Sequence, residues 1–298
     1  MAIYTFNTQT PRSHANITET RIIDLLTGTS TLFFNDPRDK EVKWLGKGGL
    51  VLWLKDVDFG ATEFWIADAE DAGQKYVTLK TSSKRASVAS SYTQPLWLAR
   101  NMANGSLYNP DVEGSTSEGH NSIWFTTLRK KAMSNSTTDL KYITSPTRFV
   151  NALRGTSLKT PLHSPFEQLN DFDISTSGIV FLAKDQTSST AQSANVNVCY
   201  IPLKTFTEIS RPRPQIIKIK SFEGQSSNPV FSPSDNSVAF LKKRDLADMN
   251  DMNRVIVFNN MRDFRAHMAI DDMPTQKSEK DWHLSPYSVA WNENGKEL

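Results

Sequence analysis

Trp44-Leu-Gly-Lys-Gly-Gly-Leu-Val-Leu-Trp53 is a phrase that the chain repeats as Phe231-Ser-Pro-Ser-Asp-Asn-Ser-Val-Ala-Phe240. Each copy has an aromatic residue at the end of one expected strand, then a short turn, then an apolar strand that closes on a second aromatic residue. The two aromatic residues are nine positions apart in both copies. A repeated unit of strand, turn and strand predicts a repetitive all-β fold.

Two further stretches are partial copies of this phrase. Ile174-Ser-Thr-Ser-Gly-Ile-Val-Phe181 has a shorter turn, and Trp291-Asn-Glu-Asn-Gly-Lys-Glu-Leu298 matches the beginning of the pattern. When the last copy is laid on the second, Leu298 matches Val238, so the sequence is expected to end inside a strand. Steps of roughly 50 to 60 residues between copies are typical of the four-stranded blades of a β-propeller.

The fold is therefore predicted to be all-β, an incomplete β-propeller of four-stranded blades with about four blades and two partial ones. A single partial propeller domain is expected to span 1–298. Its blades are expected at roughly 1–40 (partial), 41–92, 93–168, 169–222, 223–282 and 283–298 (partial). Within the fifth blade, Met261–Ile270 predicts either the one plausible helix or a long loop.

The aromatic residues have two interpretations, a packed core or a surface on which sugars or bases stack. Packing between blades is favoured because the tryptophans occupy equivalent positions of the expected strands. In particular, Trp44, Trp53, Phe231 and Phe240 are expected at equivalent inner-strand positions, buried between blades. The tryptophans to which the two interpretations apply are Trp44, Trp53, Trp65, Trp124 and Trp291.

Composition excludes several classes of protein. The chain has 298 residues, 38% of them apolar, and a net charge of +2, which describes an ordinary soluble protein. Its longest apolar runs, such as Gly49–Leu54, fall far short of the about 20 residues of a membrane-spanning helix, so no membrane partner is predicted. The first residues lack a basic stretch followed by an apolar one, so no signal peptide is expected if Met1 is the true start.

The residues that bind metals or act as nucleophiles form no motif. The single cysteine, Cys199, lies in an alternating strand and is expected to be a buried structural thiol. Asp56-Val-Asp-Phe-Gly60 resembles the opening of a calcium loop but lacks its later carboxylate, so a hairpin turn is favoured. No metal site and no cofactor are predicted. The five histidines are scattered along the sequence: His14, His120, His163, His267 and His283.

Basic residues form only two short runs, Arg129–Lys131 and Lys242–Arg244. The second is followed at once by acidic residues, among them Asp245 and Asp251. Local cancellation of this kind argues against a nucleic-acid partner.

A set of phrases resembles the propeller of the fungal dipeptidyl-peptidase V family, which are secreted serine peptidases of the prolyl oligopeptidase clan. The resemblance runs from about residue 20 to the end, and every phrase belongs to the noncatalytic part of that family. One departure lies in the third blade, where the family's longer segment is reduced to Pro110–Asn121. The phrases are Val42-Lys-Trp-Leu-Gly, Leu52-Trp-Leu-Lys, Phe64-Trp-Ile-Ala-Asp-Ala, Asn104-Gly-Ser-Leu-Tyr-Asn-Pro, Asp171-Phe-Asp-Ile-Ser, Gly178-Ile-Val-Phe-Leu-Ala-Lys-Asp, Asn228-Pro-Val-Phe-Ser-Pro and Ser237-Val-Ala-Phe-Leu-Lys.

The resemblance implies hydrolysis of short peptides by a serine, a histidine and an aspartate on an α/β-hydrolase domain that follows the propeller. The Gly-x-Ser-x-Gly elbow of that domain does not occur here, and Gly224-Gln-Ser-Ser-Asn228 departs from it at the second glycine. The α/β-hydrolase domain is therefore expected to be absent from this chain, with no catalytic residues and no activity alone. Family members are secreted, but the compartment of this chain is left open.

Two classes of function follow from this reading. The first is the substrate-gating propeller portion of a serine peptidase, with a peptide substrate only in a complete enzyme. The alternative is a noncatalytic β-propeller interaction module, or a nonfunctional truncated gene product. Because both ends are expected to fall inside blades, the chain is also predicted to self-associate through open blade edges.

Overall fold

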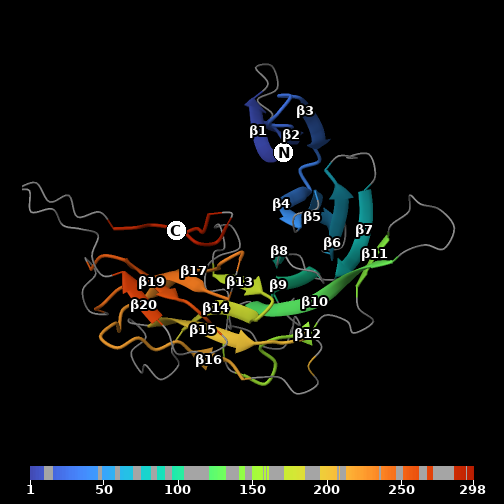
Figure 1. Ribbon diagram of the computed structural model, residues 1–298. Helices are drawn as coiled ribbons and strands as arrows, with labels where there is room; N and C mark the ends of the chain where they lie inside the picture. Colours follow the sequence, from blue (N-terminus) through green and yellow to red (C-terminus); the bar gives the residue numbers. More distant parts are fainter. Residues whose placement is uncertain are drawn as a thin grey trace, which may run out of the picture. The chain divides into compact units, whose positions relative to one another are not determined.

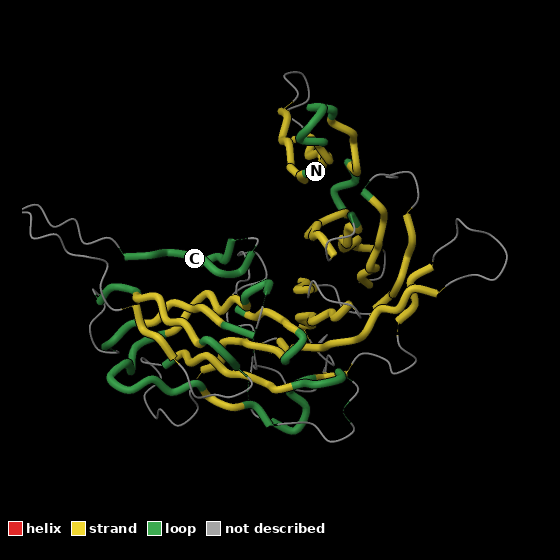
Figure 2. Tube along the Cα trace, in the orientation of Figure 1, coloured by secondary structure: helices red, strands yellow, loops and turns green. Residues whose placement is uncertain are grey.

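In a computed structural model, the described residues form twenty strands and no helix (Figures 1 and 2). The all-β prediction and its four-stranded antiparallel sheets are confirmed, and the number of blades stays a prediction. The structure describes residues 1–9, 16–45, 49–57, 61–69, 75–81, 86–90, 96–103, 121–131, 141–144, 150–156, 158, 160, 171–184, 195–206, 208, 213–234, 236–245, 251–261, 267–270, 285–292 and 294–298.

The first two sheets lie in the N-terminal part of the chain. A three-stranded sheet has the order β1-β2-β3, and a four-stranded sheet has the order β4-β5-β6-β7. All neighbouring strands in both sheets are antiparallel and follow one another in sequence. The strands are β1 (Ala2–Gln9), β2 (Asn16–Ile23), β3 (Ser30–Phe34), β4 (Asp39–Leu45), β5 (Leu50–Val57), β6 (Ala61–Asp68) and β7 (Lys75–Thr81).

The third sheet has five strands. Its order is β11-β10-β9-β8, and β12 pairs with β10 off this path. The strands are β8 (Ala86–Ser90), β9 (Leu96–Ala103), β10 (Asn121–Lys131), β11 (Lys141–Thr144) and β12 (Val150–Asn151). Residues 104–120, which include all but the last residue of the shortened segment Pro110–Asn121, lie outside the described residues.

Two four-stranded sheets complete the fold, with the orders β13-β14-β15-β16 and β17-β18-β19-β20. The expected helix or loop at Met261–Ile270 is wrong in its second half, because His267–Ile270 is strand β20, whose Met268 and Ile270 pair with Val257 and Val255 of β19. The strands are β13 (Phe172–Ser175), β14 (Gly178–Lys184), β15 (Val196–Pro202), β16 (Gln215–Ile216), β17 (Ser226–Phe231), β18 (Val238–Lys242), β19 (Arg254–Phe258) and β20 (His267–Ile270).

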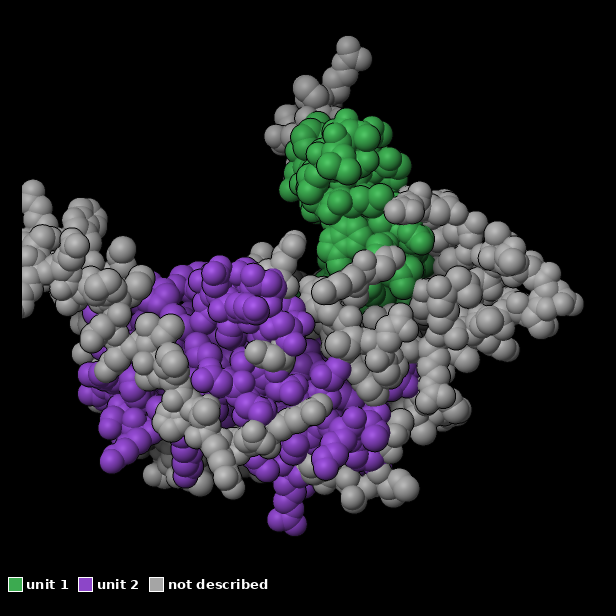
Figure 3. Space-filling view, viewed as in Figure 1, with its two compact units in different colours: residues 1–86, 129–144 green, residues 87–128, 145–298 purple. Residues whose placement is uncertain are grey.

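The chain divides into two compact units, coloured separately in Figure 3. One unit comprises residues 1–86 and 129–144, and the other comprises residues 87–128 and 145–298. The sheets β1–β3 and β4–β7 belong to the first unit. The sheets β13–β16 and β17–β20 belong to the second.

The repeated phrases pair in one register. Trp44 lies opposite Val51 on β5, and Phe231 lies opposite Val238 on β18. The second aromatic residue follows two positions later in each copy, at Trp53 and at Phe240. The predicted equivalence of these positions is therefore confirmed.

The backbone contact that closes the turn of the phrase also recurs in its copies. The residue after the first aromatic meets the residue five positions on: Leu45 pairs with Leu50, and the Ser232 N–H donates to the Ser237 carbonyl at 2.9 Å. In the last copy, the Asn292 N–H donates to the Glu297 carbonyl, also at 2.9 Å. Residues 291–292 and 294–298 thus repeat this closing contact, but the expectation that the sequence ends inside a strand is wrong, because residues 294–298 pair with no strand among the described residues.

The described apolar clusters fill seams between consecutive sheets of the same unit. Strand β14 shows how, because its apolar run is buried on both faces. Ile179 and Phe181 point into a cluster shared with β10, whereas Val180 and Leu182 point into the cluster shared with β17–β19. In the first unit, Ile22, Phe33, Phe34, Val51, Trp53, Ala67 and Ala69 form the corresponding cluster between β1–β3 and β4–β7.

Candidate functional site

The described residues contain no group of three side chains that could hold a metal ion. Of the five histidines, His267 is described only in its backbone, and the other four lie outside the described residues. No helix among the described residues is long and apolar enough to cross a membrane. What the described residues do contain is a charged cluster in the first unit and a set of polar contacts between sheets in the second.

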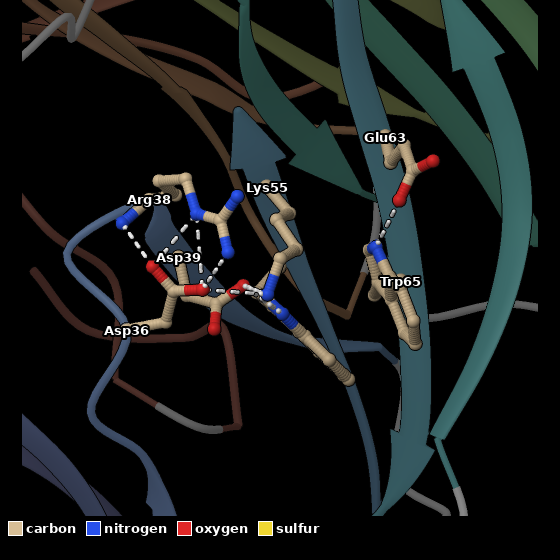
Figure 4. Close-up of polar contacts among 7 residues, drawn as sticks. Asp36, Arg38, Asp39, Lys55, Glu63 and Trp65 are labelled. Atoms are coloured by element: carbon tan, nitrogen blue, oxygen red, sulfur yellow. Dashed lines mark hydrogen bonds and ion pairs between the residues drawn. The ribbon is translucent and has the colours of Figure 1, made fainter. Parts of the chain in front are cut away.

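The charged cluster comprises Asp36, Arg38, Asp39 and Lys55 (Figure 4). The Arg38 guanidinium donates to both carboxylate oxygens of Asp36, with its Nη2 atom 2.7 Å from Oδ2. The Lys55 ammonium lies 3.0 Å from the same Oδ2 atom and 3.5 Å from Oδ1 of Asp39. Two carboxylates and two cations therefore neutralise one another at the point where the chain leaves β3 and enters β4.

The two carboxylates of the cluster titrate differently because their surroundings differ. Hydrogen bonds from the Arg38 side chain and backbone, and then from Lys55, hold the pKa of Asp36 below its ordinary value. Burial raises the pKa of Asp39, whose side chain is only 6% exposed, while the charge of Lys55 opposes that rise. Asp36 is thus the strongly ionised partner of the cluster.

Indole groups connect the charged cluster to the apolar seam. The Trp53 N–H donates to Oδ1 of Asp39 at 3.1 Å, and the Trp65 N–H donates to Oε2 of Glu63 at 3.0 Å (Figure 4). The Lys55 ammonium lies 5.9 Å from the centre of the Trp65 ring, within the range of a cation–π contact. Asp39 of the cluster and the neighbouring Glu63 thus accept the indole N–H groups of two stacked tryptophans, which is a structural role.

In the second unit, Asp173 links two consecutive sheets. Its Oδ1 atom accepts the N–H of Ile174 on its own strand, and its Oδ2 atom accepts the N–H of Phe231 on β17, both at 2.8 Å. A carboxylate that accepts backbone N–H groups forms a charge-assisted hydrogen bond. Asp173 therefore fixes where β17 lies against β13.

Residues 285–298 lie along the sheet β17–β20 and are held by polar contacts. The Trp291 N–H donates to the Val230 carbonyl at 3.2 Å, and the Asn228 side chain donates to the Tyr287 carbonyl at 3.1 Å. The hydroxyl of Ser232 donates to the Gly295 carbonyl at 3.0 Å. The last copy of the repeat is thus held through its Trp291 indole and its Gly295 carbonyl.

Lys242 is a buried cation of the second unit, with 2% of its surface exposed. Its ammonium donates to the Gly224 carbonyl at 2.9 Å and to the Ser226 hydroxyl at 3.1 Å. Burial lowers the pKa of Lys242 to about 8. The run Lys242–Arg244 is consequently not a continuous basic surface. Beside it, Asp251 pairs with Arg254 at 2.7 Å and also accepts the backbone N–H groups of Arg244 and Asp245.

The remaining predicted residues have structural positions. Trp53, Phe231 and Phe240 are buried between sheets, as predicted. The prediction that Trp44 is buried is wrong in degree, because Trp44, like Trp65, is only partly buried against the same seam as Trp53. Cys199, the single cysteine of the sequence, is buried, as expected. Val57 pairs with Ala61, so β5 and β6 are antiparallel neighbours, whereas residues 58–60 of the turn that the sequence favoured lie outside the described residues. The side chain of Trp124 lies outside the described residues.

Sequence reasoning did not single out Asp36, Asp173 or Lys242 as polar anchors. Asp173 lies in the quoted phrase Asp171-Phe-Asp-Ile-Ser, but its partner is a backbone N–H group 58 residues away, which no side-chain motif marks. For Lys242, one signal was present: it follows Val238–Leu241 directly in strand register, so alternation alone placed its side chain beside buried positions.

Comparison with known proteins relates these sheets to peptidases. No profile of a known protein family matches the chain. A probable dipeptidyl-peptidase 5 of Aspergillus niger is 26% identical over 312 residues, which cover 94% of this chain and 41% of that protein. The dipeptidyl-peptidase 5 of Aspergillus fumigatus is 23% identical, and that alignment covers 100% of this chain and 43% of the Aspergillus protein. The chain is similar to the fungal dipeptidyl-peptidases 5. The resemblance that the sequence phrases indicated is confirmed.

The likeness extends along nearly the whole chain, but the chain spans only about two-fifths of the dipeptidyl-peptidases 5 that it matches. Among solved structures, the acylaminoacyl peptidase of Pyrococcus horikoshii aligns with a TM-score of 0.52 and 9% identity. That alignment covers 91% of this chain and 38% of the peptidase. At this identity the likeness is one of fold.

Proposed function

We propose that this chain is the propeller portion of a dipeptidyl-peptidase V-like serine peptidase and that it restricts which peptides reach the catalytic serine. The observation that carries the proposal is the similarity to fungal dipeptidyl-peptidases 5 over 94% or more of the chain, at a stretch that amounts to about two-fifths of each relative. A propeller of this kind filters substrates by size, and a separate hydrolase domain cuts them.

The arrangement of strands supports a propeller. Three sheets consist of four consecutive antiparallel strands, and they carry the repeated phrase on their first two strands in one register. Each blade of a propeller is such a sheet and buries its faces against its neighbours. We extend this to about four blades and two partial ones, with the boundaries that the sequence predicts.

The proposal places the catalytic residues outside this chain. A serine peptidase needs a nucleophile activated by an adjacent base, and the strained elbow that presents such a serine has the form Gly-x-Ser-x-Gly. That motif does not occur among the 298 residues. The proposal therefore assigns the catalytic serine to a hydrolase domain outside these 298 residues, and the peptide substrate would meet this chain only in the complete enzyme.

A chimera tests this function. This chain would replace the matching stretch of the Aspergillus niger relative, and the chimera would be assayed on a short dipeptidyl substrate and on a folded protein substrate. We expect cleavage of the short peptide and exclusion of the folded protein. The matched control is the relative from which the same stretch has been deleted, which is expected to lose the discrimination between the two substrates.

The alternative of a noncatalytic interaction module predicts a different result. In that case the chain would fold by itself, with the circular dichroism of a β protein, whereas the chimera would cleave neither substrate. A chimera that cleaves both substrates at equal relative rates would contradict the filtering role while leaving the family likeness intact.

A further inference from the structure

The strand β1 has one pairing partner in the part of the chain that the structure describes. All eight of its residues pair with β2, from Ala2 opposite Ile23 to Gln9 opposite Asn16. The sheet order β1-β2-β3 places β1 at the edge, so the backbone groups on its other side have no strand beside them among the described residues. Such an edge is a template for a further strand.

The first strands of the three four-stranded sheets carry protective features that β1 lacks. Strand β4 is rich in charged residues, β13 has only four residues, and β17 contains Pro229, which cannot donate to a ladder. Strand β1 reads Ala-Ile-Tyr-Thr-Phe-Asn-Thr-Gln and contains no charge and no proline over eight residues. Charged side chains, prolines and short length are the means by which natural edge strands avoid pairing.

Three large apolar side chains are exposed on one face of this sheet. Tyr4, Phe6 and Leu32 are 38%, 52% and 41% exposed. They share a face because Tyr4 pairs with Arg21, and Arg21 pairs in turn with Leu32. The opposite face carries Ile3 and Ile22, which pack into the seam with β4–β7. The edge of β1 is thus bordered by apolar surface on its outer face.

We propose that β1 is a self-association surface, at which two copies of this chain pair their β1 strands antiparallel about a two-fold axis. Because directly opposed residues of an antiparallel pair point to the same face, an axis through Thr5 places Tyr4 of each copy opposite Phe6 of the other. Cross-strand aromatic pairs of this kind stabilise a sheet. The pairing joins two three-stranded sheets into one six-stranded sheet.

A second copy is the occupant that the charge pattern fits. An uncharged strand meets itself without repulsion in an antiparallel pair, and the ion pair of Arg21 with Glu19 on this face, at 2.9 Å, is internally neutral. A single strand ladder joins less surface than the roughly 1,200 to 2,000 Å² of a stable complex. The dimer is therefore expected to exchange with monomer and to depend on protein concentration.

Sedimentation equilibrium of the whole chain over a wide range of concentrations tests the proposal. We expect a monomer–dimer equilibrium that the double variant Tyr4→Lys with Phe6→Lys weakens at least tenfold, because it places like charges opposite one another. The matched control is Leu25→Lys with Leu26→Lys, which adds the same charge at two exposed apolar residues of the neighbouring turn and should leave the equilibrium unchanged. A chain that stays monomeric throughout, or equal weakening by both variants, overturns the proposal.

A cross-link tests the register without disturbing the face. In the Thr5→Cys variant the two-fold axis brings the new thiols together, so mild oxidation should form a disulfide-linked dimer as the two thiols lose two protons and two electrons to the added oxidant. Cys199 is buried and does not compete. Leu26→Cys, whose position is 97% exposed, measures the rate of random collision. Cross-linking of Thr5→Cys no faster than that of Leu26→Cys contradicts pairing at β1.

Discussion

Replacing Trp53 by alanine tests the seam between β1–β3 and β4–β7. Trp53 is 2% exposed, and its ring lies 5.0 Å from Phe33, 6.0 Å from Phe34 and 5.8 Å from Trp65. Removing a buried tryptophan loses its transfer free energy and leaves a cavity, which costs about 3 to 5 kcal/mol of unfolding free energy. A cavity of this size among aromatic rings cannot close by small shifts, so we expect the upper part of that range.

Trp53→Phe separates packing from hydrogen bonding. It keeps a ring in the seam but removes the N–H that donates to Asp39 at 3.1 Å. A hydrogen bond to a charged group contributes about 1.5 to 3 kcal/mol, so Trp53→Phe should destabilise less than Trp53→Ala. Urea denaturation followed by circular dichroism gives both values, and hydrogen exchange of the β5 amides assigns the loss to the first unit.

The control for this pair is Tyr287→Ala, which removes an aromatic ring that is 91% exposed. Its unfolding free energy should stay within about 0.5 kcal/mol of the parent chain. A denaturation midpoint of Trp53→Ala equal to that of Tyr287→Ala would refute the packed seam.

Three further predictions follow from the second unit and from the missing elbow motif. Gly295→Ala should destabilise the packing of residues 285–298 by about 1 to 3 kcal/mol, measured as faster hydrogen exchange at Asn292, because Gly295 has φ +69° and a Cβ atom there would lie 2.5 Å from the hydroxyls of Ser232 and Ser234. Gly155→Ala, with φ +82° and open space, is the control for backbone strain alone, and equal effects of the two variants would contradict the clash. The pKa of Lys242 is about 8 in the folded chain, against the ordinary value of 10.5. Between pH 8 and pH 10.5 the unfolded chain therefore binds one more proton than the folded chain, so the free energy of unfolding should rise with pH, on the order of 1 to 3 kcal/mol relative to Lys242→Met. Parallel pH profiles of the two proteins would show that the lysine is not desolvated. The isolated chain should hydrolyse no dipeptidyl or acyl-peptide substrate, and turnover that a serine-directed phosphonate blocks would disprove this.

The repeat was predictable because its signal is local. The spacing from Trp44 to Trp53 and from Phe231 to Phe240 sets one hairpin register, and the structure has that register in both places. Phe181 takes the equivalent place in the copy with the shorter turn, since Ile174 pairs with Ile179. Alternation and turn residues act over a few positions, so they can be read from the sequence alone.

The strand at His267–Ile270 and the polar anchors could not be read in this way. Strand β20 exists because β19 offers it a ladder, and its own short sequence favours no single structure. The contact between Asp173 and Phe231 and the pairing of Lys55 with Asp36 depend on how separate segments meet. Tertiary context decides such contacts, and no local pattern records it.

The repeated turn has a consequence for how such a chain can change over generations. Its closing backbone contact recurs between Leu45 and Leu50, Ser232 and Ser237, and Asn292 and Glu297, although the sequences between these residues share little chemistry. Different tip sequences are therefore compatible with one closing contact, and loop positions on a rigid scaffold are where new recognition arises. The tip at Ser232 and Ser234 already uses this freedom, because its hydroxyls hold the carbonyl of Gly295 in the following turn.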